Sequence, residues 1–162
     1  RCVFHFRSPA TLPGCGLVVD PSGVWFRPEG ECFIGGVAPP DDQDPDVALD
    51  DFEVDHALFD EVVWPTLAQR VPGFEALRLL SSWAGHYDVN LLDANVIVGP
   101  HPALNNLLFA NGFSGHGLQQ SPGVGRALAE WIVDGGWQSI DLSALGWARV
   151  IEDRPLREQA VV

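Results

Sequence analysis

The 162-residue chain contains no lysine, and all nine of its basic residues are arginines. Schiff-base catalysis and lysine-anchored pyridoxal phosphate therefore cannot come from this chain. Twenty-two acidic residues against nine arginines give a net charge of −13. This excludes nucleic acid as a partner, because phosphate binding needs clustered basic side chains.

Methionine is also absent and cysteine is scarce. Without a methionine at its start, the chain is expected to be a fragment, a processed product or one piece of a longer protein. Cys2, Cys15 and Cys32 are odd in number and lack C-x-x-C spacing, which predicts reduced structural thiols. No apolar run reaches the ~18 residues of a membrane helix, so no membrane span is predicted. The hydrophobic fraction of 46% indicates a globular protein.

A glycine-rich stretch after a short apolar run is the main motif. Leu107–Ala110 predicts a buried strand, and Gly112–Gly117 predicts a turn. A helix with Pro122 in its early part is predicted next, ending at Gly135–Gly136. Its apolar positions are Leu118, Val124, Leu128, Trp131 and Ile132. A turn of this kind brings backbone N–H groups and the positive helix end close to a ligand, which suits a phosphate or an electron-rich ring.

Other interpretations of this turn follow from its residues. A dinucleotide fingerprint is disfavoured by Gln120, which stands where the third glycine of G-x-G-x-x-G belongs. A hydrolase nucleophile elbow at Ser114 fails because His116 replaces its last glycine and no later histidine completes a triad. A purely structural glycine turn, which lets helix and strand pack closely, stays open.

The chain before this motif predicts antiparallel strands. Cys2–Phe6 alternates between apolar and polar residues and predicts an edge strand. Leu17–Val19 and Val24–Arg27 predict a hairpin around the turn at Asp20–Gly23. Cys32–Ile34 continues this pattern as a third strand.

A helix is predicted after these strands. Asp55 is its expected N-cap, and Pro65 is expected to kink or split it. Pro72–Gly73 ends it. Its apolar positions are Leu58, Phe59, Val62, Val63 and Leu67, and two later strands are predicted at Ala76–Ala84 and Val96–Val98.

Two clusters raise the question of a metal. Ten carboxylates lie in Asp41–Glu61 but lack the spacing and the glycine of an EF-hand loop, so a solvated loop is predicted. The spacing of His86, His101 and His116 matches no known metal pattern. No metal site is predicted. Asp93 and Asn95 are expected to shape a turn.

Ordered blocks along nearly the whole chain carry a resemblance to a known family. These blocks are Gly23–Gly30, Val54–His56, Trp83–Asp88, Asn95–Pro102 and Gly112–Glu130. They resemble the C-terminal part of the FAD-dependent oxidoreductases related to D-amino-acid oxidase, sarcosine oxidase and dimethylglycine dehydrogenase. The resemblance implies an α/β (α+β) fold with an antiparallel substrate-domain sheet and the last strand and helix of a FAD domain. It implies that residues 1–92 are mainly substrate-domain sheet and helix, and that 93–162 return to the FAD-binding domain and end in a tail, poorly packed from Ile151 onward.

The resemblance also implies where ligands bind. The expected cofactor-binding residues are Gly85, Tyr87, Gly112, Phe113, Ser114, Gly115, His116, Gly117, Leu118 and Gln119. Substrate contacts are expected from Arg27, Tyr87 and Gln119. Arg27 could clamp a carboxylate with its guanidinium, or be a surface arginine at a strand end. Tyr87, Phe113 and Leu118 have the alternative of being core residues.

The implied activity is oxidation of the C–N bond of an amine or N-methyl amino acid by hydride transfer to flavin. Noncovalent FAD is expected, since no cysteine follows Cys32 to attach it. The helix N-terminus at Gly115–Gln119 would stabilise negative charge on the reduced ring. Several oxidases of the family use a lysine near the flavin, and this chain has none. A dehydrogenase or a non-catalytic relative is therefore expected rather than an oxidase.

Two partners follow from the resemblance. The N-terminal G-x-G-x-x-G that holds the FAD pyrophosphate is absent, so a missing N-terminal FAD-binding part is expected to complete the site. Some relatives assist the assembly of respiratory complex I in mitochondria. The alternative function is therefore a non-catalytic flavoprotein of the mitochondrial matrix that binds complex I subunits.

Overall fold

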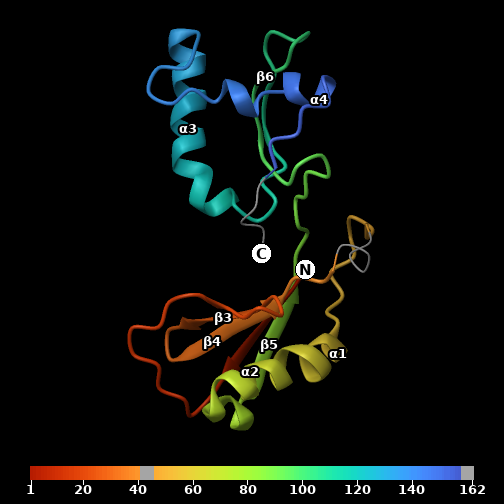
Figure 1. Cartoon of the computed structure of the whole chain (residues 1–162), viewed down its shortest axis with the longest axis vertical. Coiled ribbons are helices and arrows are strands. Elements are labelled where there is room, and N and C mark those ends of the chain that lie inside the picture. Colours follow the sequence, from red (N-terminus) through yellow and green to blue (C-terminus); the bar gives the residue numbers. More distant parts are fainter. Residues whose placement is uncertain (41–45, 158–162) are drawn as a thin grey trace. The chain divides into compact units, whose positions relative to one another are not determined.

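The computed structural model describes residues 1–40 and 46–157. They belong to two compact units, Arg1–His86 (unit 1) and Tyr87–Val162 (unit 2), shown in Figure 1. The boundary expected between residues 92 and 93 lies within unit 2, and the assignment of the units to a substrate domain and a FAD domain stays a prediction. Part of the acidic stretch, residues 41–45, and the end of the expected tail, residues 158–162, lie outside the described residues.

Unit 1 contains a five-stranded antiparallel sheet in the order β2-β3-β4-β1-β5. The predicted hairpin and third strand are confirmed. The prediction that Cys2–Phe6 is an edge strand is wrong, because β1 pairs with both β4 and β5. Its sequence could not show that a strand more than 70 residues later pairs along its other side. The strands are β1 (Cys2–Arg7), β2 (Val18–Val19), β3 (Val24–Glu29), β4 (Cys32–Val37) and β5 (Arg78–Ala84).

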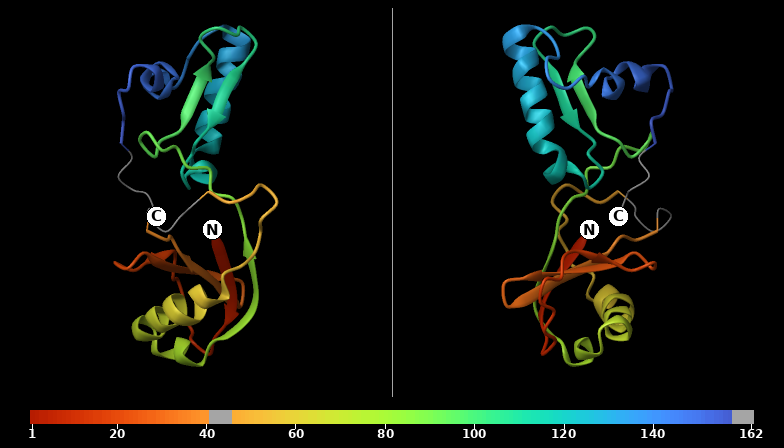
Figure 2. Two further views of the ribbon diagram at one scale, coloured as in Figure 1. Left: turned by 90° about the vertical axis from the view of Figure 1, so that its right-hand side faces the viewer. Right: turned by 60° about the vertical axis from the view of Figure 1, so that its left-hand side comes forward.

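One face of this sheet is aromatic and buried. Phe4 lies opposite Gly35, which lies opposite Phe26, so these residues share a face. Phe74 packs edge-on against Phe26, with ring centroids 5.1 Å apart. Burying each such ring stabilises the fold by roughly 1.5–3 kcal/mol. The helical segment covers this face (Figure 2), and the buried cluster consists of Phe4, Phe6, Val24, Phe26, Phe33, Val37, Phe59, Val63, Leu67 and Phe74.

The helical segment of unit 1 begins where the sequence predicts. Asp55 Oδ1 accepts the N–H of Leu58 at 3.2 Å, which confirms the N-cap. Pro65 lies in the first turn of α2, directly after a wide π-helical turn, where its missing N–H is tolerated. The elements are α1 (His56–Leu58), η2 (Phe59–Val63), α2 (Trp64–Arg70) and η3 (Pro72–Ala76).

Unit 2 is built from a hairpin and a long helix that lies along it (Figures 1 and 2). The predicted strand, turn and helix are present, with the strand displaced by one residue. The prediction that this strand is buried is wrong, because β7 belongs to a two-stranded sheet and its residues are half-buried or exposed. Gly135 ends the helix in the left-handed conformation, at φ 78°. The elements are β6 (Ile97–Pro100), β7 (Leu108–Asn111), α3 (Gly117–Asp134), η4 (Ser143–Leu145) and α4 (Ala148–Ile151).

The first turns of α3 accommodate a proline. Pro122 cannot donate to the carbonyl of Leu118, four residues earlier. The hydroxyl of Ser121 donates to that carbonyl instead, at 3.0 Å. The helix therefore continues through Pro122 with this carbonyl satisfied.

A membrane-spanning helix, a metal cluster and a disulfide are all absent from the residues that the structure describes. No helix there is long and apolar enough to cross a bilayer. No three His, Cys, Asp or Glu side chains in the same ranges lie together as a metal site. Cys2, Cys15 and Cys32, all of them described, form no disulfide.

Glu130 ties α3 to the segment that follows it. Its carboxylate accepts the N–H of Ser139 at 2.9 Å, the hydroxyl of Ser139 at 2.7 Å and Nε of Arg126 at 2.9 Å. These contacts, led by the N–H of Ser139, lower the pKa of Glu130 to about 2.

We expect Glu130→Gln to lower the melting temperature at neutral pH, and we expect this effect to shrink as the pH falls from about 4.5 to 2. The folded pKa of about 2 lies below the ordinary 4.5. The stabilisation is therefore complete above about pH 4.5 and is lost as the pH falls toward the folded pKa. Thermal unfolding of the wild type and of Glu130→Gln between neutral pH and about pH 2 measures how the difference in melting temperature depends on pH. A difference in melting temperature that stays constant on acidification would contradict the assignment.

Candidate functional site

The turn between β7 and α3 has an unusual backbone. Gly112, Ser114 and Gly115 have φ values of 72°, 47° and 90°. The left-handed region costs a residue with a Cβ roughly 1–2 kcal/mol. Ser114 adopts it nonetheless, so the contacts around the turn must hold it there.

Asp88 and Tyr87 supply those contacts. One carboxylate oxygen of Asp88 accepts the N–H of Gly112 at 2.5 Å, and the Asp88 carbonyl accepts the N–H of Ser114 at 2.8 Å. The hydroxyl of Tyr87 donates to the carbonyl of Ser114 at 2.7 Å. The segment before β6 therefore braces the turn from one side. Tyr87 is half-buried and contributes its hydroxyl to this bracing.

Gly115 is required by the ring of Tyr87. A Cβ at this position would lie 2.0 Å from the Tyr87 hydroxyl oxygen and 2.8 Å from its ring carbon. The sequence suggests that glycine here admits the flavin, and the structure adds a protein side chain that must also be cleared. Gly112 is similar, since its Cβ would lie 3.0 Å from that of Asn90.

Ser114 is buried within the turn, with 1% of its surface exposed. Its hydroxyl accepts the N–H of Asn90 at 3.0 Å and donates to the carbonyl of Gly112 at 3.3 Å. A hydroxyl so enclosed cannot reach a substrate as a nucleophile. The geometry agrees with the sequence in excluding a hydrolase elbow.

The N-terminus of α3 is open to a ligand. The backbone N–H groups of Gly117, Leu118 and Gln119 have no acceptor within the helix. No acidic residue lies in the first turn, and no side chain caps it. The positive end of this 18-residue helix is therefore not neutralised by the chain's own groups there. The turn and this helix end fit an electron-rich ring such as a flavin.

The side chains around this helix end differ in burial. Leu118 is 87% exposed and Gln119 is exposed, so both are available for contacts. Phe113 packs against the core of unit 2, beside Val96, Val98 and Val124. The backbone of the turn is therefore available to a ligand, whereas the ring of Phe113 is packed against the core.

A buried ion pair lies behind the turn. Arg149 Nε donates to Asp93 at 2.7 Å, and the two side chains are 3% and 0% exposed. Burial raises the pKa of Asp93, but hydrogen bonds from Arg149 and from the N–H of Leu156 outweigh it and leave the pKa below its ordinary value. Residues 151–157 are all exposed, as expected for a poorly packed tail, although the backbone of Leu156 is held by Asp93.

The sequence suggests Asp93 as a turn residue but misses its partner. Arg149 lies 56 residues later, and no local pattern links the two. Asp88 is the last residue of the block Trp83–Asp88, which resembles the family. This position is the only sequence feature that points to a role for Asp88 in the site. Such pairings are set by the tertiary fold.

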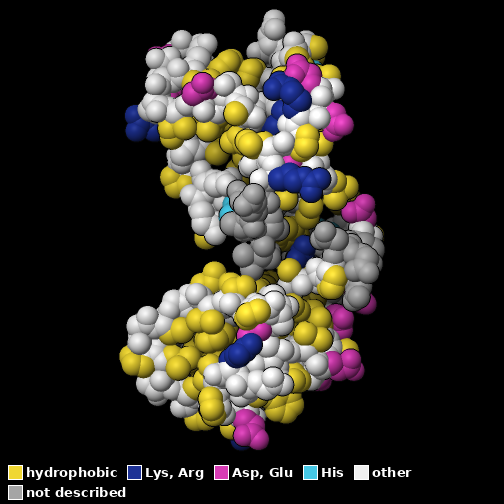
Figure 3. Space-filling model, in the orientation of Figure 1, with side chains coloured by type: hydrophobic (Ala, Val, Ile, Leu, Met, Phe, Trp, Pro, Cys, Tyr) yellow, Lys and Arg dark blue, Asp and Glu magenta, His cyan; other side chains and the backbone are white. Residues whose placement is uncertain are grey.

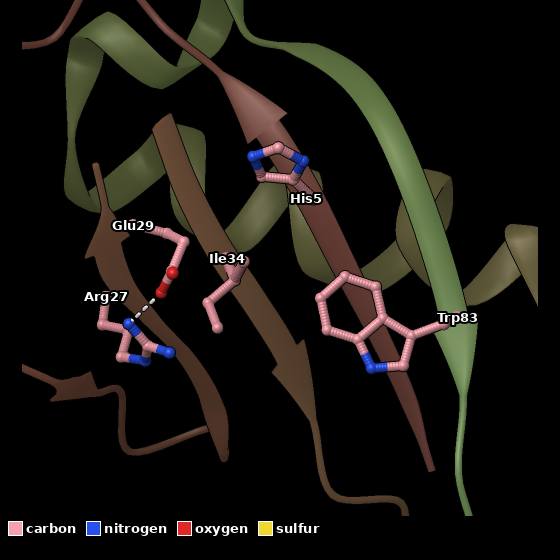
Figure 4. A pocket seen from close by; sticks show the side chains of 5 residues that line it. All are labelled: His5, Arg27, Glu29, Ile34 and Trp83. Carbon is pink, nitrogen blue, oxygen red and sulfur yellow. Dashed lines mark hydrogen bonds and ion pairs between the residues drawn. The ribbon is translucent and has the colours of Figure 1, made fainter. Parts of the chain in front are cut away.

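Arg27 lies on the other face of the sheet in unit 1. His5, Ile34 and Arg27 lie side by side there on three neighbouring strands. They line a shallow hollow of about 240 Å³ with Glu29 and Trp83, shown in Figure 4. Arg27 forms an ion pair with Glu29 and donates to the carbonyl of Pro28 at 3.0 Å. Its charge therefore has a counter-ion within the chain.

Gly85 also lies in unit 1, just after β5. Its N–H donates to the carbonyl of Arg1 at 2.9 Å, and its carbonyl accepts the terminal amine at 2.8 Å. The structure thus brings together the expected ligand-binding residues from Tyr87 to Gln119 in unit 2. Arg27 and Gly85 belong to unit 1.

Comparison with known proteins identifies the family. The family described as FAD dependent oxidoreductase matches residues 3–131, which is more than half of the chain. The chain belongs to the FAD-dependent oxidoreductase family. A relative from Xenopus laevis, FAD-dependent oxidoreductase domain-containing protein 1, is 51% identical over 150 residues, which cover 91% of this chain. The chain spans 30% of the length of that relative.

Solved structures show the same fold in this family. L-proline dehydrogenase from P. horikoshii matches 93% of the chain with a TM-score of 0.72 and 22% identity. Glycine oxidase from Geobacillus kaustophilus matches 90% with the same TM-score and identity. The match covers 40% and 37% of those two chains. The mixed α/β fold with antiparallel sheets is thus that of one part of a flavoenzyme.

Proposed function

We propose that this chain is part of a FAD-dependent dehydrogenase that oxidises the C–N bond of an amine or an N-methyl amino acid. One observation supports this most strongly: a braced glycine turn leads into an uncapped helix N-terminus in a chain of the FAD-dependent oxidoreductase family. FAD, bound noncovalently, would supply the hydride acceptor. The chain's own residues would bind the ring and orient the substrate.

The turn would hold the flavin through its backbone. The N–H groups of Gly117, Leu118 and Gln119 have no acceptor within the helix. Placed at the pyrimidine edge, they and the positive helix end would stabilise negative charge gained on reduction. Exposed Leu118 would keep water from that edge.

The face of the sheet in unit 1 that carries Arg27 and Trp83 would receive the substrate. The hollow there combines an indole, an aliphatic side chain and an ion pair. Arg27 would share its guanidinium between Glu29 and a substrate carboxylate. The two solved relatives are named for proline and glycine, which supports an amino acid or a related amine.

A further segment would complete the FAD site. A Rossmann G-x-G-x-x-G, which binds the pyrophosphate, is absent from this sequence. One side of α3 also carries small and apolar residues at spacings of three and four, and all of them are exposed. Figure 3 shows hydrophobic side chains on the surface of both units. We propose that a FAD-binding segment covers this side of α3, formed by Leu118, Pro122, Gly125, Ala129 and Ile132.

The proposal is tested on the full-length protein, meaning this chain together with that segment. We expect it to be yellow, and to release FAD on denaturation because the flavin is not covalently attached. Anaerobic mixing with amino acids and their N-methylated forms is expected to bleach the visible absorption band of the flavin with at least one of them. A folded full-length protein without flavin would refute the proposal.

An alternative is a flavoprotein that stabilises respiratory complex I during assembly in the mitochondrial matrix. The absence of lysine motivates it, since several oxidases of the family use one near the flavin. The same experiment decides: flavin without bleaching by any candidate substrate favours assembly. Co-migration with complex I on native gels would then be expected.

A further inference from the structure

A continuous route of hydrogen bonds leads from Arg149 to the glycine turn. Arg149 donates to both carboxylate oxygens of Asp93, at 2.7 and 3.2 Å. The side-chain amide of Asn90 donates to Asp93 Oδ1 at 3.0 Å. The backbone N–H of Asn90 donates to the hydroxyl of Ser114, inside the turn, at 3.0 Å. Three contacts therefore join α4 to the turn.

The Arg149 end of this route is rigid. Its guanidinium also donates to the carbonyls of Leu145, Asn95 and Val96 at 2.5, 2.9 and 2.9 Å. With its side chain 3% exposed, Arg149 cannot exchange these acceptors for water. A planar fork with acceptors on all three of its nitrogens has one geometry. Asp93 is thereby fixed in position and orientation.

Asn90 transmits this position to the turn. Its amide bridges Asp93 and the carbonyl of Asn95, the second contact at 2.6 Å. Its Cβ lies 3.0 Å from where a Cβ of Gly112 would be, so the two backbones approach closely. A displacement of Asn90 would move both its contact with Gly112 and its hydrogen bond to Ser114.

We propose that Arg149 is a positioning residue for the flavin-binding turn, acting through Asp93 and Asn90. This rests on the proposed function, because it takes Gly112–Gly117 as the segment that holds the flavin. Arg149 touches neither cofactor nor substrate. Arg149 positions the backbone groups of Gly112–Gly117 that would contact the flavin. It does so from α4, whose sequence contains no flavin-binding motif.

Two single variants and their combination test this in full-length protein. Asn90→Ala keeps the Cβ beside Gly112 and removes the amide link, while Arg149→Lys keeps the charge and loses the fork. Each is expected to weaken FAD binding roughly tenfold, as for couplings carried through packed contacts. Fluorescence titration of the apoprotein gives Kd, and the fine structure of the visible flavin band reports the ring's surroundings.

The double variant separates positioning from general destabilisation. If Arg149 acts through Asn90, Arg149→Lys adds no further loss of affinity in the Asn90→Ala background. Glu130→Gln is the matched control, because it weakens contacts with Ser139 and Arg126, neither of which belongs to the route from Arg149 to the turn. It should leave Kd and the flavin band unchanged.

The two proposals fail in different ways. A full-length wild type without flavin refutes the proposed function and this inference together. Wild-type flavin with unchanged Kd in both single variants, or with additive losses in the double variant, refutes the inference alone. Should Asn90→Ala not fold, the comparison of Arg149→Lys with Glu130→Gln decides, since only a positioning role predicts different flavin affinities for the two.

Discussion

Replacing Gly115 with alanine in the full-length protein is expected to weaken FAD binding by roughly thirtyfold or more. The new Cβ would lie 2.0 Å from the hydroxyl oxygen of Tyr87 at a φ of 90°. Moving the Tyr87 ring breaks its hydrogen bond to Ser114, and the backbone adds strain. Together these cost about 2 kcal/mol or more, and every 1.4 kcal/mol is about tenfold in Kd. Equilibrium titration with FAD measures the effect.

Gly136→Ala is the matched control for this variant. Gly136 follows the C-terminal end of α3, has no atom within 4 Å of an added Cβ and does not need positive φ. Alanine there should leave FAD affinity unchanged. An unchanged Kd for Gly115→Ala, with both proteins folded, would mean that the turn does not hold the flavin. The combined variant with Tyr87→Ala should recover part of the affinity if the clash dominates over the strain.

Removing Arg149 is expected to destabilise the protein by about 3–5 kcal/mol, because Arg149→Met leaves the carboxylate of Asp93 buried without its partner. Asp93 is 0% exposed, and its pKa is held below the ordinary value although burial acts to raise it. The backbone carbonyls that Arg149 serves also lose their donor. Urea unfolding of the full-length protein gives the free-energy difference.

Arg126→Met provides the comparison for an exposed ion pair. Arg126 is 66% exposed where it contacts Glu130 one turn along α3. Exposed pairs of this kind contribute about 0.2–1 kcal/mol. Equal losses of unfolding free energy for the two variants would show that the buried pair is not the stabilising contact we describe. Asp93→Asn should fall between them, because the amide keeps some hydrogen bonds of the carboxylate.

The local elements of the fold could be predicted from sequence because each is specified by neighbours. Period-two alternation and the turn at Asp20–Gly23 specify the hairpin of β2 and β3. Asp55 caps its helix through a carboxylate only three residues from the N–H it accepts. Gly135 ends α3 because it can adopt positive φ. These are interactions over a few residues, so composition and spacing reveal them.

The family and the position of the glycine turn could likewise be predicted from the sequence. The ordered blocks and the three glycines in Gly112–Gly117 are patterns along the chain and need no knowledge of distant contacts. Only the tertiary structure decided that β1 is central, that Tyr87 rather than a ligand alone requires Gly115, and that Arg149 pairs with Asp93. Each of these depends on residues 27 to 82 positions apart. Such contacts form because folding buries apolar surface and must then satisfy every polar group buried with it. Nothing in the residues next to Arg149 or Gly115 specifies which distant group will do so.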